Sequence, residues 1–303
     1  MFEGFATIAI LIGLGILLAQ LRIIDDSGRR TLSTLAFYVA SPALLLTVLE
    51  DTDISAIFSG NLVAVGAAVL VSVLPSLAVS RWRRHDLARS VVTALTASYQ
   101  NAGNLGLPIA AYVLGDTALV APVLLLQLVL LQPLALTLLD ADASGERLSL
   151  GKVLRRPFTN PITIATLIGL ALTVTDTRLP RPVQDPLELV GGMAVPAMLL
   201  AYGVALRLGP LPGRGVPAIE LAFVTTLKMV VQPLAAYLVG RFLLDLDTAA
   251  LLAVTVMSAL PTAQNVYVIA ARYDRSVLLA RDAVFVSTLA SVPVVLVITA
   301  LIA

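Results

Sequence analysis

Long apolar segments alternate with short polar connections along almost the whole chain. A helix that crosses a membrane needs about 20 mostly apolar residues. Ten segments of this kind can be marked, at residues 5–21, 33–49, 60–80, 90–114, 117–139, 158–175, 187–206, 217–241, 248–271 and 279–302. Because the connections leave little chain for a soluble domain, the pattern predicts an all-α membrane protein with ten transmembrane helices.

The composition agrees with this prediction. Of the 303 residues 58% are hydrophobic and 13% are charged, and the mean hydropathy is +0.95, which is more apolar than a soluble core requires. The chain has no cysteine, which excludes disulfides, thiolate metal sites and cysteine catalysis. A formal charge of +1 gives no reason to expect nucleic acid as a partner. Membrane lipid is therefore the expected surrounding.

The basic residues are distributed unevenly over the connections. Of the 20 Lys and Arg residues, sixteen follow predicted helices 1, 3, 5, 7 and 9, and only Arg178, Arg181 and Arg241 follow helices 2, 4, 6 and 8. Cytoplasmic loops carry the excess of Lys and Arg in membrane proteins. We therefore expect a multi-pass protein of the cell (inner) membrane with both termini on the non-cytoplasmic side.

The two halves of the chain resemble each other. The polar stretch 140–157 separates a first repeat, 1–139, from a second, 158–303. Four matches occur in the same order: TIAILIGLG (7–15) with TIATLIGLA (163–171), SPALLL (41–46) with VPAMLL (195–200), IAAY (109–112) with IAAR (269–272), and Pro133 with Pro293. Five helices in each half mean that the second copy enters the membrane from the opposite side. This predicts the 5+5 inverted repeat of many secondary transporters.

The fourth helix of each half is interrupted by residues that break helices, QNAGNLGLP (100–108) and SALPTAQNVY (258–267). Irregular backbone at membrane depth is tolerated only where protein or a water-filled cavity satisfies its polar groups. Two breaks at matching positions therefore indicate one binding site, with the N-terminal dipoles of half-helices turned towards it. The alternative is that the polar side chains only join helices. The candidate substrate-binding residues are Asn101, Asn104, Pro108, Pro261, Gln264, Asn265 and Tyr267.

Lys228 is the one basic residue near the centre of a predicted span. An ammonium group near the centre of a span is costly unless it is paired or hydrated. Lys228 could attract an anionic substrate, or it could take the place of a sodium ion and titrate instead, which makes it a candidate for substrate binding and for coupling. Alternatively, it snorkels to the cytoplasmic face, about 15 Å away along the helix.

Groups for catalysis or for carboxylate-based coupling are scarce. No predicted span carries the central Asp or Glu of a proton relay or of a carboxylate-bound sodium site. The sequence contains no HExxH, no GxSxG and no Walker lysine, and its single histidine, His85, lies in an arginine-rich connection. We expect no catalytic residue, metal site or cofactor. An intramembrane enzyme, a channel and a sensor are the less favoured alternatives.

In its two interrupted helices the chain resembles the auxin efflux carrier family of bacterial and plant anion transporters. This family is related in fold to bile acid:sodium symporters. The family pattern N-x-G-x-x-G-x-P occurs as NAGNLGLP (101–108), and ALPTAQNVYVIAARY (259–273) followed by STLAS (287–291) resembles the family's ninth helix. The resemblance covers the whole chain. It implies that Asn101 and Asn265 lie where helices 4 and 9 cross, and that Asn104 replaces what is commonly an aromatic or aliphatic residue.

The family resemblance also implies a fold and a function. Helices 3–5 and 8–10 would form a mobile transport domain, and helices 1, 2, 6 and 7 a scaffold that joins two copies in a homodimer. The function would be export of small organic anions, such as auxin-like acids or dicarboxylates, by an elevator motion. The membrane potential drives each unit of negative charge outward by about 2.3 kcal/mol per 100 mV, which favours uniport. Proton coupling through Lys228, or symport with sodium or protons of the bile acid transporter type, is the alternative.

Overall fold

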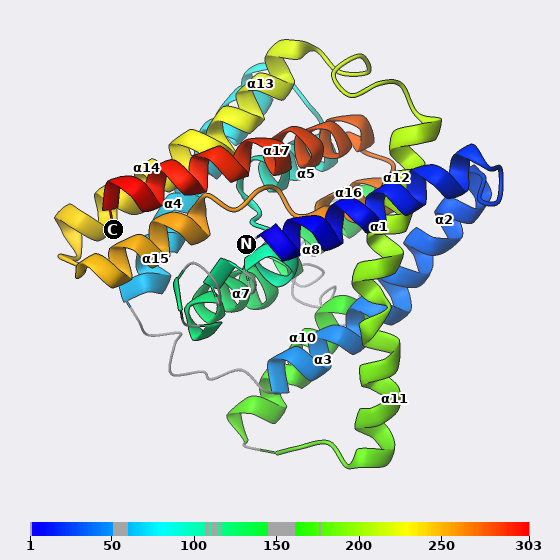
Figure 1. Cartoon of the computed structure of the whole chain (residues 1–303), viewed down its shortest axis with the longest axis horizontal. Helices are drawn as coiled ribbons and strands as arrows, with labels where there is room; N and C mark the ends of the chain where they lie inside the picture. The colour runs from blue at the N-terminus through cyan, green and yellow to red at the C-terminus, as the bar shows by residue number, and fades with distance from the viewer. Residues whose placement is uncertain are drawn as a thin grey trace.

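The structure is a computed structural model, and it describes residues 2–50, 60–106, 109–110, 114–115, 117–144, 161–175 and 177–302. Within these residues all extended regular structure is helical (Figure 1), and the only β-type pairing is one isolated bridge. This agrees with the predicted all-α class. Pro108 and the connection 145–160 lie outside the described residues.

Most of the helices follow the apolar segments of the sequence, whereas the largely polar helix Asp26–Leu35 lies mainly before the predicted span 33–49. In the labels of Figure 1, with η for π- and 3₁₀-helical pieces, they are α1 (Phe2–Gln20), α2 (Asp26–Leu35), η1 (Ala36–Ala40), α3 (Ser41–Glu50), α4 (Gly60–Trp82), α5 (Leu87–Ser98), η3 (Ala102–Gly106), η5 (Thr117–Val120), α7 (Ala121–Leu125), η6 (Leu126–Leu131), α8 (Gln132–Ala143), α10 (Pro161–Val174), α11 (Arg181–Gly192), α12 (Ala194–Leu208), α13 (Ala218–Thr226), η8 (Leu227–Val231), α14 (Gln232–Leu238), η9 (Val239–Leu243), α15 (Thr248–Ser258), α16 (Gln264–Tyr273) and α17 (Val277–Ile302).

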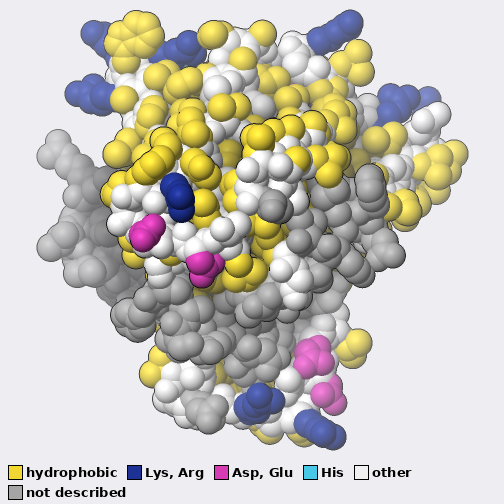
Figure 2. Space-filling view, turned by 60° about the vertical axis from the view of Figure 1, so that its left-hand side comes forward, with side chains coloured by type: hydrophobic (Ala, Val, Ile, Leu, Met, Phe, Trp, Pro, Cys, Tyr) yellow, Lys and Arg dark blue, Asp and Glu magenta, His cyan; other side chains and the backbone are white. Residues whose placement is uncertain are grey.

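Five helices among the described residues are long and apolar enough to cross a membrane: 60–82, 122–143, 181–208, 218–243 and 277–302. Each lies on a predicted span, and the shorter apolar helices 9–20, 161–174 and 248–258 lie on others. Figure 2 shows hydrophobic side chains over much of the described surface, with Lys and Arg mainly at its margins. The chain is therefore an integral membrane protein, while the count of ten spans stays a prediction.

Aspartate side chains fix the starts of three helices. Asp25 accepts a hydrogen bond from the backbone N of Gly28, Asp86 from that of Arg89, and Asp247 from that of Ala250, at 2.7–2.8 Å. An N-cap of this kind satisfies an otherwise unpaired amide and contributes about 1 kcal/mol. These caps set where α2, α5 and α15 begin.

Contacts among the described helices fall mainly into two sets (Figure 1). One set comprises α1, α2, α3, α10, α11 and α12, and its most extensive contacts join α1 to α12 and α3 to α10. The other comprises α4, α5, α8, α13, α14, α15 and α17. Helix α16 touches both, because it packs against α17 and α5 on one side and against α12 and α2 on the other.

The α1–α12 contact depends on two glycines. A Cβ atom at Gly203 would overlap the backbone oxygen of Ile12, and one at Gly15 would overlap the backbone oxygen of Leu200. The two backbones therefore approach more closely than any side chain allows.

Gly203→Ala is expected to lower the free energy of unfolding by about 1–3 kcal/mol, because α1 and α12 must separate to admit the methyl group. Gly13→Ala on α1 is the matched control, since nothing lies within 4 Å of a Cβ atom there. Thermal unfolding of detergent-solubilised protein, followed by size exclusion, measures the difference. Equal melting temperatures for the two variants would contradict the close packing.

Candidate functional site

The two interruptions of the sequence meet in the structure. Helix α5 ends before Tyr99 and α15 ends before Pro261, and the extended residues between the half-helices pair with each other. The backbone N of Asn101 donates to the carbonyl of Pro261 at 2.8 Å, and that of Ala263 donates to the carbonyl of Tyr99 at 3.1 Å. Between these bonds lies the isolated antiparallel bridge. Each break thus satisfies backbone groups of the other, as irregular backbone in a membrane requires.

Side chains from the helix η8–α14 bind the carbonyls that the breaks leave free. The Nε2 atom of Gln232 donates to the carbonyl of Ser98, the last residue of α5, at 3.0 Å. Nζ of Lys228 donates to the carbonyl of Ser258, the last residue of α15, at 3.0 Å, and to Oε1 of Gln232 at 2.8 Å. One connected pair of side chains therefore joins the C-terminal ends of both half-helices.

The position of Lys228 has an electrostatic reason. The C-terminal end of a helix carries a partial negative charge, which a cation stabilises. Lys228 is 0% exposed, and its ammonium group lies at the end of α15. It does not reach the surface of the protein as a snorkelling lysine would. A single lysine amino group is thus buried beside the two breaks, with two neutral oxygens as its described acceptors.

A cavity of about 200 Å³ adjoins the breaks and lies between the two helix sets. None of the described residues that line it is charged. The lining residues include Phe37, Ser41, Leu44 and Leu45 near the start of α3, Tyr99, Gln100, Asn101 and Ala102 at the first break, Leu124, Gln127, Leu128 and Gln132 on α7–η6–α8, Val195 and Met198 on α12, and Asn265, Val268 and Ile269 on α16.

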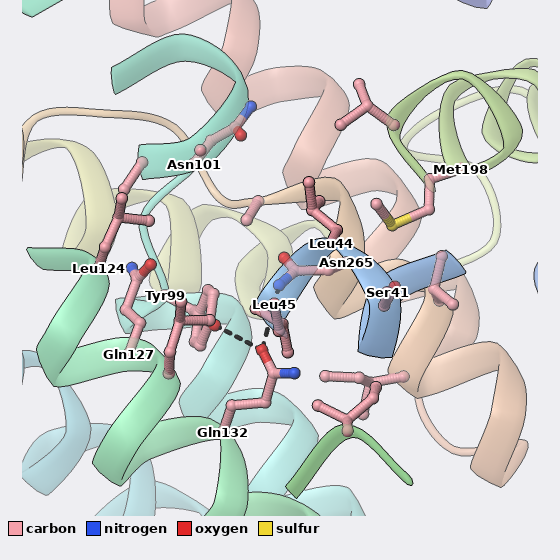
Figure 3. Close-up of a pocket in the computed structure, with 18 of the residues that line it drawn as sticks. Ser41, Leu44, Leu45, Tyr99, Asn101, Leu124, Gln127, Gln132, Met198 and Asn265 are labelled. Atoms are coloured by element: carbon pink, nitrogen blue, oxygen red, sulfur yellow. Dashed lines mark hydrogen bonds between the residues drawn. The ribbon is translucent and has the colours of Figure 1, made fainter. Parts of the chain in front are cut away.

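Amide side chains form the polar part of this cavity (Figure 3). Oε1 of Gln132 accepts a hydrogen bond from the hydroxyl of Tyr99 at 2.7 Å and a long one from Nδ2 of Asn265 at 3.5 Å. Nε2 of Gln127 donates to both Oε1 and the backbone carbonyl of Gln100, at 2.8 and 2.9 Å. The cavity is therefore lined by neutral groups, and mutual hydrogen bonds orient Tyr99, Gln127 and Gln132.

Three buried polar atoms of the cavity residues have no hydrogen-bond partner among the described residues: Nε2 of Gln100, Nδ2 of Asn101 and Oδ1 of Asn265. Buried polar groups in proteins are nearly always bonded, and each unsatisfied one costs about 1–3 kcal/mol. Two of the three are amino donors on neighbouring residues. A carboxylate, which only accepts hydrogen bonds, has the matching chemistry.

The structure brings together some of the sequence-predicted residues. Asn101 and Asn265 both line the cavity, and Pro261 provides the carbonyl that binds the backbone of Asn101. Gln264, at the start of α16, is fully buried but is not among the described lining residues.

Other predicted residues lie elsewhere. Tyr267 is buried further along α16, where its hydroxyl accepts a hydrogen bond from Arg29 at 2.9 Å. Lys228 contacts the ends of the half-helices and is not among the described lining residues. The backbone of Asn104 lies in η3, whereas its side chain, like Pro108, is outside the described part of the chain.

Sequence reasoning missed Gln127 and Gln132. Both belong to LLLQLVLLQP (124–133), where they are the two amides in an otherwise apolar run, and that isolation is a usable signal. The local backbone is a further signal, because π-helical turns are rare and occur frequently at functional sites. Gln127 lies in η6, Phe37 in η1 and Lys228 in η8.

Comparison with known proteins gives one family and two relatives. The family described as "Membrane transport protein" matches residues 1–145 and 136–299. A protein of Rhizobium meliloti (strain 1021) named "Putative malonate transporter" is 28% identical over 295 residues, which cover 94% of this chain and 90% of that protein. An "Uncharacterized transporter" of Methanothermobacter thermautotrophicus is 27% identical over 293 residues, which cover 95% of this chain and 94% of that protein.

Proposed function

This chain belongs to the membrane transport protein family, of the auxin efflux carrier type, and on that premise we propose that it carries small organic anions across the membrane. It is a transporter and not an enzyme. The observation that supports an anionic substrate is the pair of unpartnered amino donors, Nε2 of Gln100 and Nδ2 of Asn101, at the cavity. A carboxylate, which only accepts hydrogen bonds, is complementary to donors of this kind.

The cavity size supports a short acid as the substrate. Pockets for drug-sized ligands measure about 300–1,000 Å³, whereas this cavity measures about 200 Å³. A compact dicarboxylate suits that volume better than a molecule of bile acid size. The name of the Rhizobium meliloti relative adds malonate as the first acid to test. Auxin-like acids are the second class.

For the mechanism, we propose an elevator motion of one helix set against the other. The cavity has walls from both sets, so a displacement of the set that holds the breaks would carry a bound anion along the other. In this proposal the chain is a 5+5 inverted repeat of residues 1–139 and 158–303, with crossing helices at the breaks. Helices α1, α2, α3, α10, α11 and α12 form the scaffold, and the scaffold joins two copies in a homodimer.

For energetics, we propose uniport that favours export. The ammonium group of Lys228 binds the carbonyl of Ser258 and so supplies, as part of the protein, the positive charge that a sodium ion would otherwise bring. Proton coupling through Lys228 is the second candidate.

Uptake of labelled malonate into proteoliposomes tests this proposal. Uptake is expected to be independent of sodium and to increase when an imposed potassium gradient with valinomycin makes the interior positive. Sodium-dependent uptake would support the symporter alternative and overturn uniport. Absence of binding and of uptake for malonate and for a panel of other short acids would overturn the organic anion assignment.

A topology prediction accompanies this function. Ser144 follows α8 in the basic connection near the midpoint, and Asp53 lies in the stretch 51–59, outside the described residues. Single cysteines at these positions, in a chain without other cysteines, are expected to label from opposite faces of the membrane. Membrane-impermeant maleimide on intact and on permeabilised cells measures this, and labelling of both sites from outside would overturn the span assignment.

A further inference from the structure

A second cavity, of about 410 Å³, lies between α2 and α16. Its character differs from that of the amide cavity, because most of its lining side chains are charged or carry hydroxyls. These charged and hydroxyl-bearing residues are Arg29, Arg30, Ser33, Thr34, Arg272 and Asp274.

The two cavities follow one another along the same pair of helices. On α2–η1, Thr34 lines the second cavity and Phe37 lines the amide cavity. On α16, Ile269 lines the amide cavity and Arg272 lines the second one. Three residues of helix correspond to about 5 Å, or about one turn. The second cavity is therefore one helical turn nearer to the ends of α2 and α16 that carry the arginines.

Among the described residues, one guanidinium group of the second cavity has no carboxylate partner. Arg29 and Arg30 share the carboxylate of Asp26, and the hydrogen bond from Arg29 holds the pKa of Asp26 below its usual value, so that carboxylate stays ionised. Arg272 has no carboxylate partner among the described residues. Its guanidinium lies over the rings of Tyr38 and Tyr273, 5.0 and 5.8 Å from their centroids.

The balance of charge and hydrogen bonds favours an anion. The described lining holds three arginines and one carboxylate, that of Asp274, and even with Asp26, the partner of Arg29 and Arg30, the net charge is positive. The side chain of Ser33 also lines the cavity and is only 8% exposed, and its hydroxyl oxygen has no hydrogen-bond partner among the described residues. An arginine with free donors and an unpartnered hydroxyl are groups that bind a carboxylate or a phosphate.

We propose that this second cavity is an anion-capture site, in which Arg272 and Ser33 bind the carboxylate of a substrate before it moves one helical turn to the amide cavity. The identity of the anion as substrate rests on the proposed function, whereas the binding of a small anion does not. The phosphate of an acidic lipid shares the same chemistry, and the experiment separates the two sources.

The test uses the absence of cysteine from the chain. Thr34 is exposed at this cavity, so Thr34→Cys provides a single thiol whose rate of reaction reports the local potential. The measured quantity is the ratio of the reaction rate of a negatively charged methanethiosulfonate reagent to that of a positively charged one. This ratio is expected to be higher at the introduced cysteine than for a small thiol in solution. Adding Arg272→Gln should lower this ratio at least about threefold, because a positively lined cleft concentrates anions.

Arg207→Gln is the matched control, since it removes the same charge from an exposed position on α12 that is not among the described residues of this cavity. An equal drop in the ratio for Arg207→Gln and Arg272→Gln would overturn the capture site.

Malonate at millimolar concentration is expected to slow labelling by the anionic reagent in phosphatidylcholine liposomes. Slowing by added phosphatidylglycerol but not by malonate would identify a lipid site and overturn substrate capture. If labelling is anion-selective and is slowed by malonate, but malonate is not taken up, the anion site is supported. Only the proposal that malonate is transported is then contradicted.

Discussion

Lys228→Met is expected to lower the free energy of unfolding by about 2–5 kcal/mol and to abolish transport. The substitution keeps the apolar length of the side chain but leaves two buried acceptors, the carbonyl of Ser258 and Oε1 of Gln232, without their donor. Each unsatisfied acceptor costs about 1–3 kcal/mol.

Met229→Leu is the control for this variant, because Met229 is the buried neighbour of Lys228 and a change of similar volume there removes no hydrogen bond. Thermal unfolding in detergent and malonate uptake at two pH values, with and without sodium, measure the effects. A variant as stable and active as the parent under every condition would show that Lys228 neither holds the breaks together nor contributes to transport.

Asn101→Ala is expected to weaken malonate binding by about 1–3 kcal/mol, or about 5- to 150-fold, while the protein stays as stable as the parent. Two observations lead to this combination. The side chain lines the amide cavity, and its Nδ2 atom has no hydrogen-bond partner among the described residues, so its removal breaks no described side-chain bond. Asn265→Ala should act similarly, because its one described side-chain bond, to Gln132, is long.

This prediction separates substrate binding from helix joining. If the polar side chain only joined helices, its removal would destabilise the protein, and the molecules that remained folded would transport normally. Gln184→Ala is the control, because that amide is also bonded to another side chain, that of Glu188, but on α11 and away from the cavity. Calorimetric titration of malonate, together with melting temperatures, distinguishes the outcomes. Loss of stability with unchanged malonate affinity would refute the binding role of Asn101.

The sequence was sufficient for the helices and for the breaks, because both are recorded in local composition. Apolar length predicted the positions of most described helices but not that of the polar helix α2, and the unusual density of Asn, Gly and Pro predicted where two helices are interrupted. Two of the candidate binding residues, Asn101 and Asn265, line one cavity although they belong to different halves of the chain, and their role in binding stays a prediction.

Helical periodicity explains which candidates on α16 do not line that cavity. Asn265, Val268 and Ile269 are spaced by three and four residues and therefore share a face. Gln264 and Tyr267 share a different face. The candidate set around 258–267 was chosen by polarity alone, so it mixed the two faces.

The partners of Lys228 could not be predicted from the sequence in the same way. One of them, the carbonyl of Ser258, is a backbone group, which every residue possesses, so no pattern of side chains marks it. It becomes an acceptor only because α15 ends there. The cavity glutamines were overlooked for a related reason, since single amides in an apolar helix do not show which neighbour they face.

The pairing of the two breaks also bears on the order in which the protein is made. The backbone bonds from Asn101 to Pro261 and from Ala263 to Tyr99 join segments that leave the ribosome far apart in time. Until the second segment has been inserted, the first has no partner for these polar groups in the lipid bilayer. The backbone pairing at the first break therefore forms only after the second half has been inserted. A chain that ends in the central connection would lack the segment that pairs with its interrupted helix.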